Sequence, residues 1–237
     1  MINWIKFDGI KSTDFGLYVG GQQSFRAPVK NIIKQSIPNR NGAFVIDNGV
    51  FDNVLVTYVL LGIGNFKSKI NDIKEWLLSP NGYVKLEDSY NPDYYRMGMV
   101  VNGIDFIMHN LNTIGKANVL FDCKPQRYLT VGDSTYELGS SGTLVNPTKF
   151  SAKPLIHVEG YGKLRVNGTQ ITVANEFPEV YIDCEAMDCY SGTGANANAA
   201  VSFSTDDFPT LKAGNNAYTV NQTHITAADI VPRWWTV

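Results

Sequence analysis

The middle of the sequence holds a run of small residues that limits how the chain can be divided into domains. It reads Gly139-Ser140-Ser141-Gly142-Thr143-Leu144-Val145-Asn146-Pro147. Small residues make a segment flexible, and the closing proline lacks the N–H group that a central strand needs. The run therefore predicts a hinge at 139–147 between a domain at 1–138 and a domain at 148–237. Each part is long enough to bury its own hydrophobic core.

The predicted N-terminal domain is mainly β, with one helix covering a sheet. The stretch from Val54 to Leu61 is almost continuously apolar and rich in β-branched residues, which favours a strand buried on both faces. After Asn65 the apolar spacing changes to that of a helix, with the intervening charged residues turned outward. The apolar positions are Phe66, Ile70, Ile73 and Leu77. We expect a helix at about 65–78, capped by Asn65 and stopped by the turn at 80–82.

The predicted C-terminal domain is a β-sandwich of about seven short strands. Asn167-Gly168 favours a two-residue hairpin turn, which fixes the register of the strands on either side. In that register Leu164 lies opposite Ile171 on the face that packs in the core, and Arg165 lies opposite Gln170 on the solvent-exposed face. Further short apolar strands separated by turn residues continue to the end of the sequence.

A segment from Gln22 to Gly42 differs from the regular strands around it. Pro28, Pro38, Asn39 and Asn41 interrupt the strand pattern, and no acid lies between Asp14 and Asp47. The basic residues in this window are Arg26, Lys30, Lys34 and Arg40. The segment is predicted to be a long basic loop or an extended arm, either simply solvated or in contact with an acidic partner surface.

Charge and composition exclude several classes of protein. The formal net charge of −2 does not suit a nucleic-acid-binding domain. The N-terminus has no basic region followed by an apolar run, and no segment is long and apolar enough for a membrane span, so we expect neither secretion nor membrane insertion. The cysteines, Cys123, Cys184 and Cys189, are few and odd in number, which is typical of reduced thiols made in a cytosol.

The sequence lacks the familiar patterns of enzymes and cofactor-binding proteins. His109, His157 and His224 are isolated, and the pair Cys184 and Cys189 has no second ligand pair to complete a zinc site. There is no nucleophile elbow and no phosphate-binding Walker loop. We therefore predict no catalytic, cofactor-binding or metal site and no enzymatic activity.

Two sets of residues leave other chemistry open. Asp183, Glu185, Asp206 and Asp207 could form a glycosidase pair or a calcium site, although acids beside turns are common. The aromatic residues of the C-terminal part could form a platform for stacking a sugar, or could instead pack in the core or at a subunit interface. The aromatic residues concerned are Tyr190, Tyr218, Trp234 and Trp235.

Several segments follow one another in a characteristic order along the chain. The N-terminal segments are Phe7 to Leu17, Ile37 to Gly42, Trp76-Leu77 and Phe121 to Tyr128. The later segments are Asn146-Pro147, Tyr181 to Glu185 with Tyr190, and Asp207 to Asn216. In this order they resemble the distal tail protein (Dit) family of long, non-contractile-tailed bacteriophages over nearly the whole chain, and no single motif among them is diagnostic.

This resemblance implies a structural virion protein at the distal end of the tail, made in the host cytoplasm. Proteins of the family are expected to form a homo-hexameric ring, single or stacked, whose N-terminal β-sandwich or split-barrel domain closes the ring below the tail tube protein. The C-terminal galectin-like β-sandwich would hold tail-associated, receptor-binding or baseplate proteins during host attachment. DNA would only pass through the lumen. A galectin-like fold does not by itself imply sugar binding.

Two alternatives to the tail-hub function remain. The C-terminal sandwich could be a lectin-like module that binds host cell-wall glycans, which a glycan titration would detect. A glycan hydrolase would instead need Asp183 or Glu185 for turnover.

Overall fold

The computed structural model describes residues 3–21, 26–64, 66–109 and 114–237. The chain is mainly β and divides into two compact units, residues 1–127 with Val237, and residues 128–236. The mainly β fold class predicted from the sequence is confirmed. None of the helices in the described ranges is both long and apolar enough to span a bilayer.

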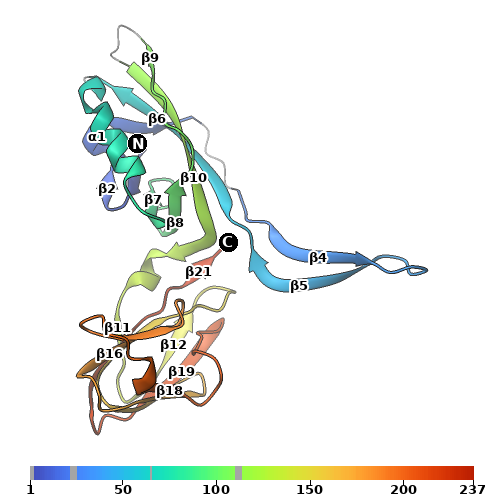
Figure 1. The fold of residues 1–237 in the computed structure, drawn as a ribbon, viewed down its shortest axis with the longest axis vertical. Coiled ribbons are helices and arrows are strands. Elements are labelled where there is room, and N and C mark those ends of the chain that lie inside the picture. Colours follow the sequence, from blue (N-terminus) through green and yellow to red (C-terminus); the bar gives the residue numbers. More distant parts are fainter. Residues whose placement is uncertain (1–2, 22–25, 65, 110–113) are drawn as a thin grey trace. The chain divides into compact units, whose positions relative to one another are not determined.

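The first unit is built on one large antiparallel sheet with strand order β2-β1-β7-β8-β10-β6-β3, and β9 also pairs with β10 (Figure 1). The strands are β1 (Ile5–Phe7), β2 (Ile10–Lys11), β3 (Leu17–Gly20), β4 (Lys30–Ser36), β5 (Ala43–Phe51), β6 (Val54–Ile63), β7 (Val84–Asp88), β8 (Tyr94–Val100), β9 (Ile107–His109) and β10 (Ile114–Leu129). The helical segments are the 3-10 turns η1 (Ser12–Phe15) and η2 (Phe66–Lys69) and the helix α1 (Ile70–Leu78).

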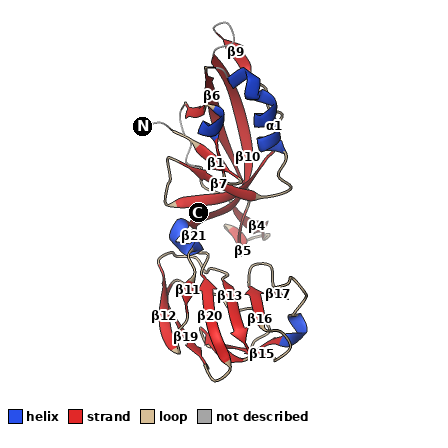
Figure 2. Ribbon diagram, turned by 90° about the vertical axis from the view of Figure 1, so that its left-hand side faces the viewer, coloured by secondary structure: helices blue, strands red, loops and turns tan. Residues whose placement is uncertain are grey.

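Helix α1 covers the sheet through the apolar face that the sequence predicts (Figure 2). Ile73 and Leu77 are buried, and the indole nitrogen of Trp76 donates a hydrogen bond to the Phe7 carbonyl at 2.9 Å. The predicted helix at about 65–78 is therefore confirmed from Phe66 onward, although its first turn is a 3-10 turn. The predicted cap, Asn65, lies outside the described residues.

A pair of glycines allows the turn before α1 to dock closely on the sheet. Gly62 on β6 lies directly opposite Gly115 on β10, and the ring of Phe66 rests on both. A Cβ atom would lie 2.6 Å from the Phe66 ring at Gly62 and 2.1 Å from it at Gly115. These glycines are needed for close contact with an aromatic ring rather than for a turn.

The second unit is a sandwich of two five-stranded antiparallel sheets, β11-β20-β13-β16-β17 and β12-β19-β14-β15-β18. Its strands are β11 (Tyr136–Glu137), β12 (Ser141–Asn146), β13 (Leu155–Gly160), β14 (Gly162–Val166), β15 (Thr169–Val173), β16 (Glu179–Asp183), β17 (Asp188–Ser191), β18 (Val201–Phe203), β19 (Gly214–Val220) and β20 (Ile225–Val231). The short strand β21 (Trp235–Thr236) belongs to neither of these two sheets. The 3-10 turns are η3 (Thr130–Asp133) and η4 (Asn198–Ala200). The β-sandwich prediction is confirmed, although the two sheets hold ten strands rather than about seven.

The turn at Asn167-Gly168 sets the predicted register. Leu164 pairs with Ile171, and Arg165 pairs with Gln170. Asn167 and Gly168 both have positive φ angles, 49° and 86°, which is the backbone that this two-residue turn requires. Leu164 and Ile171 are buried in the core between the two sheets.

The run predicted as a hinge at 139–147 is a strand in the structure. Ser141–Asn146 forms β12 and pairs along its length with β19. The division between the compact units instead follows Arg127, near the end of β10. Gly142 is small because the ring of Tyr218 packs against it, where a Cβ atom would lie 2.4 Å from the hydroxyl oxygen. The predicted domain limits, 1–138 and 148–237, are therefore replaced by the division after Arg127.

Candidate interaction site

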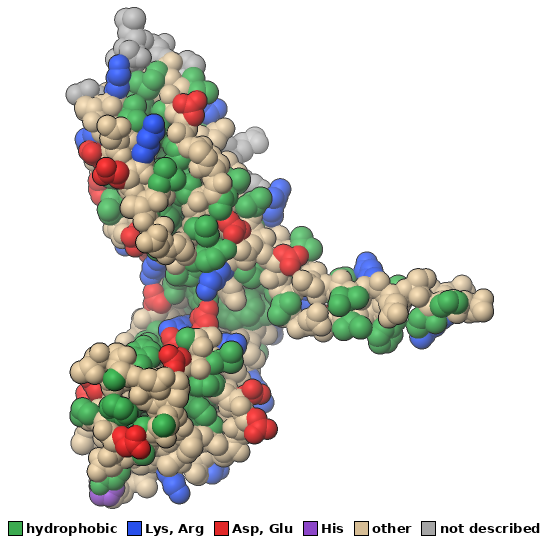
Figure 3. Space-filling model, in the orientation of Figure 1, with side chains coloured by type: hydrophobic (Ala, Val, Ile, Leu, Met, Phe, Trp, Pro, Cys, Tyr) green, Lys and Arg blue, Asp and Glu red, His purple; other side chains and the backbone are tan. Residues whose placement is uncertain are grey.

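Strands β4 and β5 form a hairpin that pairs with no other described strand. Every residue from Lys30 to Val50 is exposed, including many apolar ones, and Figure 3 shows hydrophobic side chains along the hairpin. An isolated two-stranded ribbon is marginally stable in water, and its open edges and apolar surface favour association. This hairpin therefore has the properties of a surface that is covered by a partner.

The register of the hairpin separates two faces. Ile33 pairs with Ile46 and Gln35 pairs with Phe44, which defines an apolar face of Ile33, Phe44 and Ile46. The exposed fractions of these three side chains are 52%, 50% and 41%. The opposite, mixed face carries Ile32, Lys34, Val45 and Asp47. Apolar residues concentrated on one face are typical of a contact surface.

The structure corrects the sequence-based description of this segment. The predicted basic loop or arm at 22–42 contains strand β4, and Pro38 and Asn39 lie in the hairpin turn rather than interrupting a strand. Residues 22–25 lie outside the described residues. Lys30 forms an ion pair with Asp47, so part of the predicted basic character is neutralised within the hairpin. The hydrogen bond from Lys30, aided by the Gly49 amide, lowers the pKa of the Asp47 carboxyl.

A polar and aromatic row crosses the outward face of one sheet in the second unit. On β13 the side chains of Ile156 and Val158 enter the core, so His157 and Glu159 point outward. The strand register places His157 between Asp229 on β20 and Tyr181 on β16, and Tyr181 opposite Tyr190 on β17. The His157 and Tyr181 rings stack at 4.4 Å, and the Tyr181 and Tyr190 rings at 5.4 Å.

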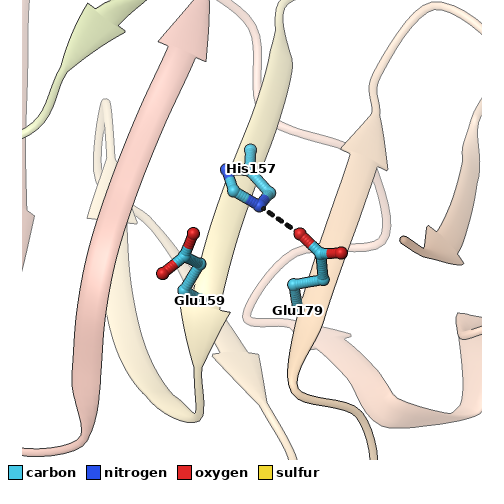
Figure 4. Close-up of side chains that lie close together, drawn as sticks. All are labelled: His157, Glu159 and Glu179. Carbon is cyan, nitrogen blue, oxygen red and sulfur yellow. Dashed lines mark hydrogen bonds and ion pairs between the residues drawn. The ribbon is translucent and has the colours of Figure 1, made fainter.

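Carboxylates hold both ring nitrogens of His157. Nδ1 lies 3.0 Å from Asp229 Oδ2, and Nε2 lies 3.0 Å from Glu179 Oε2 (Figure 4). Partial burial lowers the pKa of His157, but the hydrogen bonds and charges of Asp229 and Glu179 outweigh it, so the pKa lies above its ordinary value. His157 is isolated in the sequence because its partners lie on other strands. His224 stacks on Tyr161, and the side chain of His109 is not described.

The four acids considered for catalysis, Asp183, Glu185, Asp206 and Asp207, have different environments. The Asp183 carboxylate accepts hydrogen bonds from Nη1 and Nη2 of the Arg233 guanidinium, at 2.7 and 2.9 Å, and from the backbone N–H groups of Glu185 and Ala186. Glu185 accepts a hydrogen bond from the Tyr128 hydroxyl at 3.1 Å. Asp206 and Asp207 lie in an exposed turn after β18. Asp183 is thus part of an ion pair rather than an unpaired general base.

The Asp183–Arg233 pair should make folding stability depend on acid pH. Partial burial raises the pKa of Asp183, but hydrogen bonds from Arg233 and the backbone amides outweigh this and lower it below the ordinary value near 3.9. A carboxylate with a lowered pKa stabilises the fold fully above its unfolded-state pKa, and this stabilisation is lost as the pH falls through the lower folded-state pKa. Arg233→Gln should therefore lower the free energy of unfolding by about 2 kcal/mol at pH 7, and this loss should shrink as the pH falls below the unfolded-state pKa of about 3.9.

Denaturant unfolding of both forms between pH 7 and pH 2.5 would measure this difference. Lys6→Gln provides the control, because the Lys6–Glu87 pair is more exposed and should contribute at most about 1 kcal/mol. If Arg233→Gln lowered the free energy of unfolding by the same amount at both ends of the pH range, the Asp183–Arg233 pair would not be the source of the pH dependence.

The aromatic residues proposed as a sugar platform have separate environments. Trp234 is buried in the sandwich core, and Tyr218 packs against Gly142. Trp235 stacks on Phe150 at 4.4 Å and donates its indole N–H to the Ser151 carbonyl. Tyr190 stacks on Tyr181, which is not one of the four aromatic residues predicted for the platform.

All three cysteines are free and buried. Burial raises the pKa of the thiols of Cys123, Cys184 and Cys189 to about 12. At neutral pH they are therefore protonated, and they behave as small apolar side chains.

Comparison with known proteins finds a relationship at the level of structure. No family model matches the sequence, and no curated protein matches it. The SPP1 Dit (gp 19.1) protein, described as a paradigm of the hub adsorption apparatus in phages infecting Gram-positive bacteria, superposes with a TM-score of 0.70 at 14% identity, covering 97% of this chain and 98% of that one. Chains of the phage P2 baseplate in its activated conformation, with Ca and with Sr, give TM-scores of 0.60 and 0.51 at 12% identity, covering 97% of each chain. The chain therefore has the fold of the SPP1 Dit protein over nearly its whole length.

Proposed function

We propose that this chain is a structural protein of a phage tail, a hexameric hub that links the tail tube to tail-associated and receptor-binding proteins at host attachment. The observation that carries the proposal is the likeness to the SPP1 Dit protein across both units rather than one. A sandwich alone is shared by many unrelated functions, but the combination of both units over 97% of the chain is much more restrictive. The proposed place of action is the distal end of the virion tail.

The β4–β5 hairpin supports a role in assembly. Its apolar face of Ile33, Phe44 and Ile46 is exposed in the single chain and needs a partner to be removed from water. We assign this face to contacts within the ring or to the stacking contact between ring and tail tube. Contacts that repeat head to tail and close after six copies would cover such faces without forming open fibres.

A non-enzymatic function agrees with the environments of the candidate acids. Asp183 is held by Arg233, and Glu185 is engaged by Tyr128. On the outward face of the second unit, charged side chains form ion pairs and aromatic rings stack on one another, and both arrangements suit a binding surface. Synthesis in the host cytoplasm and reduced thiols belong to the same proposal.

Negative-stain electron microscopy of the purified chain, alone and with the tail tube protein, tests the proposal. Ring-shaped particles with sixfold symmetry and a central hole are expected. Particles without a ring, both alone and after addition of the tube protein, would contradict it.

A lectin-like function is a second candidate, and the stacked Tyr181 and Tyr190 rings on an outward face favour it. Sugars stack on such aromatic surfaces. Titration against host cell-wall glycans would show saturable binding that Tyr190→Ala removes. Binding that requires Tyr190, together with no ring, would favour the lectin function over the hub.

A further inference from the structure

Three side chains of types that can bind metals lie close together on the outward face of the second unit (Figure 4). His157 and Glu159 come from β13, and Glu179 comes from the neighbouring β16. One ligand atom from each lies within 4.8 Å of the other two. We propose that this group binds a divalent transition-metal ion of the Zn²⁺ type. The proposal is independent of the hub function.

The sheet itself holds the three ligands in position. His157 and Glu159 are two residues apart on one strand and therefore share a face, while Glu179 is the direct register partner of Glu159. The buried side chains of Ile156, Val158 and Val180 fix both strands to the core. Ligands on paired strands are preorganised, so binding would require side-chain rotations rather than a rearrangement of the backbone.

A fourth residue orients the histidine for metal binding. Asp229 on β20 lies 3.0 Å from Nδ1 of His157, on the side of the ring opposite Glu179. Histidines that bind metals through one nitrogen usually donate the other N–H group to a carboxylate or carbonyl, which fixes the tautomer and the ring direction. Stacking on Tyr181 at 4.4 Å further fixes the ring plane. Asp229 is thus a positioning residue, and Nε2 is the atom directed at the ion.

The charges in this cluster also favour a cation. Three carboxylates, Glu159, Glu179 and Asp229, surround a single imidazole, so the group remains negative even when the ring carries a proton. A metal ion between Nε2 of His157 and Glu179 would replace the shared proton, which leaves to solvent. Divalent charge would then offset the repulsion between the two glutamates.

The ligand types indicate which metal fits. An imidazole nitrogen with two carboxylates suits Zn²⁺ and similar transition metals, whereas Ca²⁺ and Mg²⁺ prefer shells made of oxygen. Three protein ligands leave at least one position for water or for a donor from another molecule. The expected order of affinity is therefore Zn²⁺ or Co²⁺ well above Ca²⁺ or Mg²⁺.

Titration of the full-length, chelator-treated chain with Zn²⁺ by calorimetry tests the site. We expect one ion per chain, a higher thermal midpoint with Zn²⁺, and a visible Co²⁺ spectrum that Zn²⁺ abolishes. Glu159→Gln should weaken Zn²⁺ binding at least tenfold, and because Glu159 is exposed this variant should keep its fold. Asp229→Asn should keep the site but weaken it by roughly 10-fold to 100-fold and change the Co²⁺ spectrum.

Matched controls separate this site from general metal binding. His224→Gln and Glu176→Gln remove the same two side-chain types elsewhere in the second unit, and both should leave the affinity unchanged. The cysteines should not compete, because burial keeps them protonated. Absence of saturable Zn²⁺ binding, affinity unchanged in Glu159→Gln, or Ca²⁺ bound more tightly than Zn²⁺ would each overturn the proposal.

Discussion

Replacing the apolar face of the β4–β5 hairpin is expected to abolish ring assembly or docking to the tail tube. The variant Ile33→Thr, Phe44→Thr and Ile46→Thr removes three exposed apolar side chains and keeps residues that favour strands. Central apolar contacts at interfaces commonly contribute about 1–2 kcal/mol each, so each subunit contact should weaken by roughly 100-fold or more. Sedimentation of the variant, alone and mixed with the tube protein, measures the loss.

The mixed face of the same hairpin provides the matched control. Ile32→Thr and Val45→Thr change exposed apolar residues on these strands, but on the side that also carries Lys34 and Asp47. These substitutions should leave assembly and docking within a few-fold of the original chain. Intact rings and intact tube docking in the triple variant would show that the apolar face has no part in assembly.

Phe66→Ala is expected to destabilise the first unit strongly. The Phe66 ring is fully buried against Gly62 and Gly115, and neither glycine has a side chain that could extend into the space that the ring leaves. Truncation of a buried phenylalanine typically costs about 3–5 kcal/mol. Hydrogen exchange of the β6 and β10 amides in the full chain would report this loss locally. Leu78→Ala, at an exposed position of α1, should change stability by about 0.5 kcal/mol or less.

A double-mutant cycle tests the contact between Phe66 and the glycine pair directly. Gly62→Ala alone should destabilise the unit, because its Cβ atom would lie 2.6 Å from the Phe66 ring. In the Phe66→Ala background the same substitution should cost much less, because the ring is gone. Additive effects of the two substitutions would contradict the proposed contact.

Local sequence patterns predicted the local structure well. The Asn167-Gly168 turn determined a register that the structure confirms, and the spacing from Phe66 to Leu77 predicted the helix and its buried face. Both predictions depend on residues close together in sequence, where turn chemistry and helical period act directly. The resemblance to the distal tail protein family predicted the fold over the whole chain, which structural comparison confirms.

Features that depend on distant residues were predicted less well. The sequence predicts that Gly142 belongs to a flexible hinge, but this residue is small because Tyr218 packs against it from another strand. The run Val54 to Leu61 was expected to be buried on both faces, yet its burial alternates and Leu55 is 46% exposed. An apolar run shows that residues can be buried, whereas the neighbouring strands determine which face is covered.

The polar cluster around His157 also depends on residues that are distant in sequence, so the sequence alone did not predict it. His157 and Glu159 alternate with buried residues on β13, and this alternation was the available signal that both point outward. Glu179 and Asp229 reach them only through pairing with β16 and β20, at least 20 residues away in sequence. The spacing of these residues therefore resembles no known motif, although the strand register brings them together.

The solution mass of the purified chain, measured by light scattering after size exclusion, tests the hub assignment most directly. One chain has a mass of 26.2 kDa, so a single six-membered ring has about 157 kDa and two stacked rings have about twice that. The hub assignment predicts one of these two masses, and the triple hairpin variant should shift it towards the single chain. A mass of 26 kDa for the unmodified chain, both alone and in the presence of the tail tube protein, would contradict the assignment.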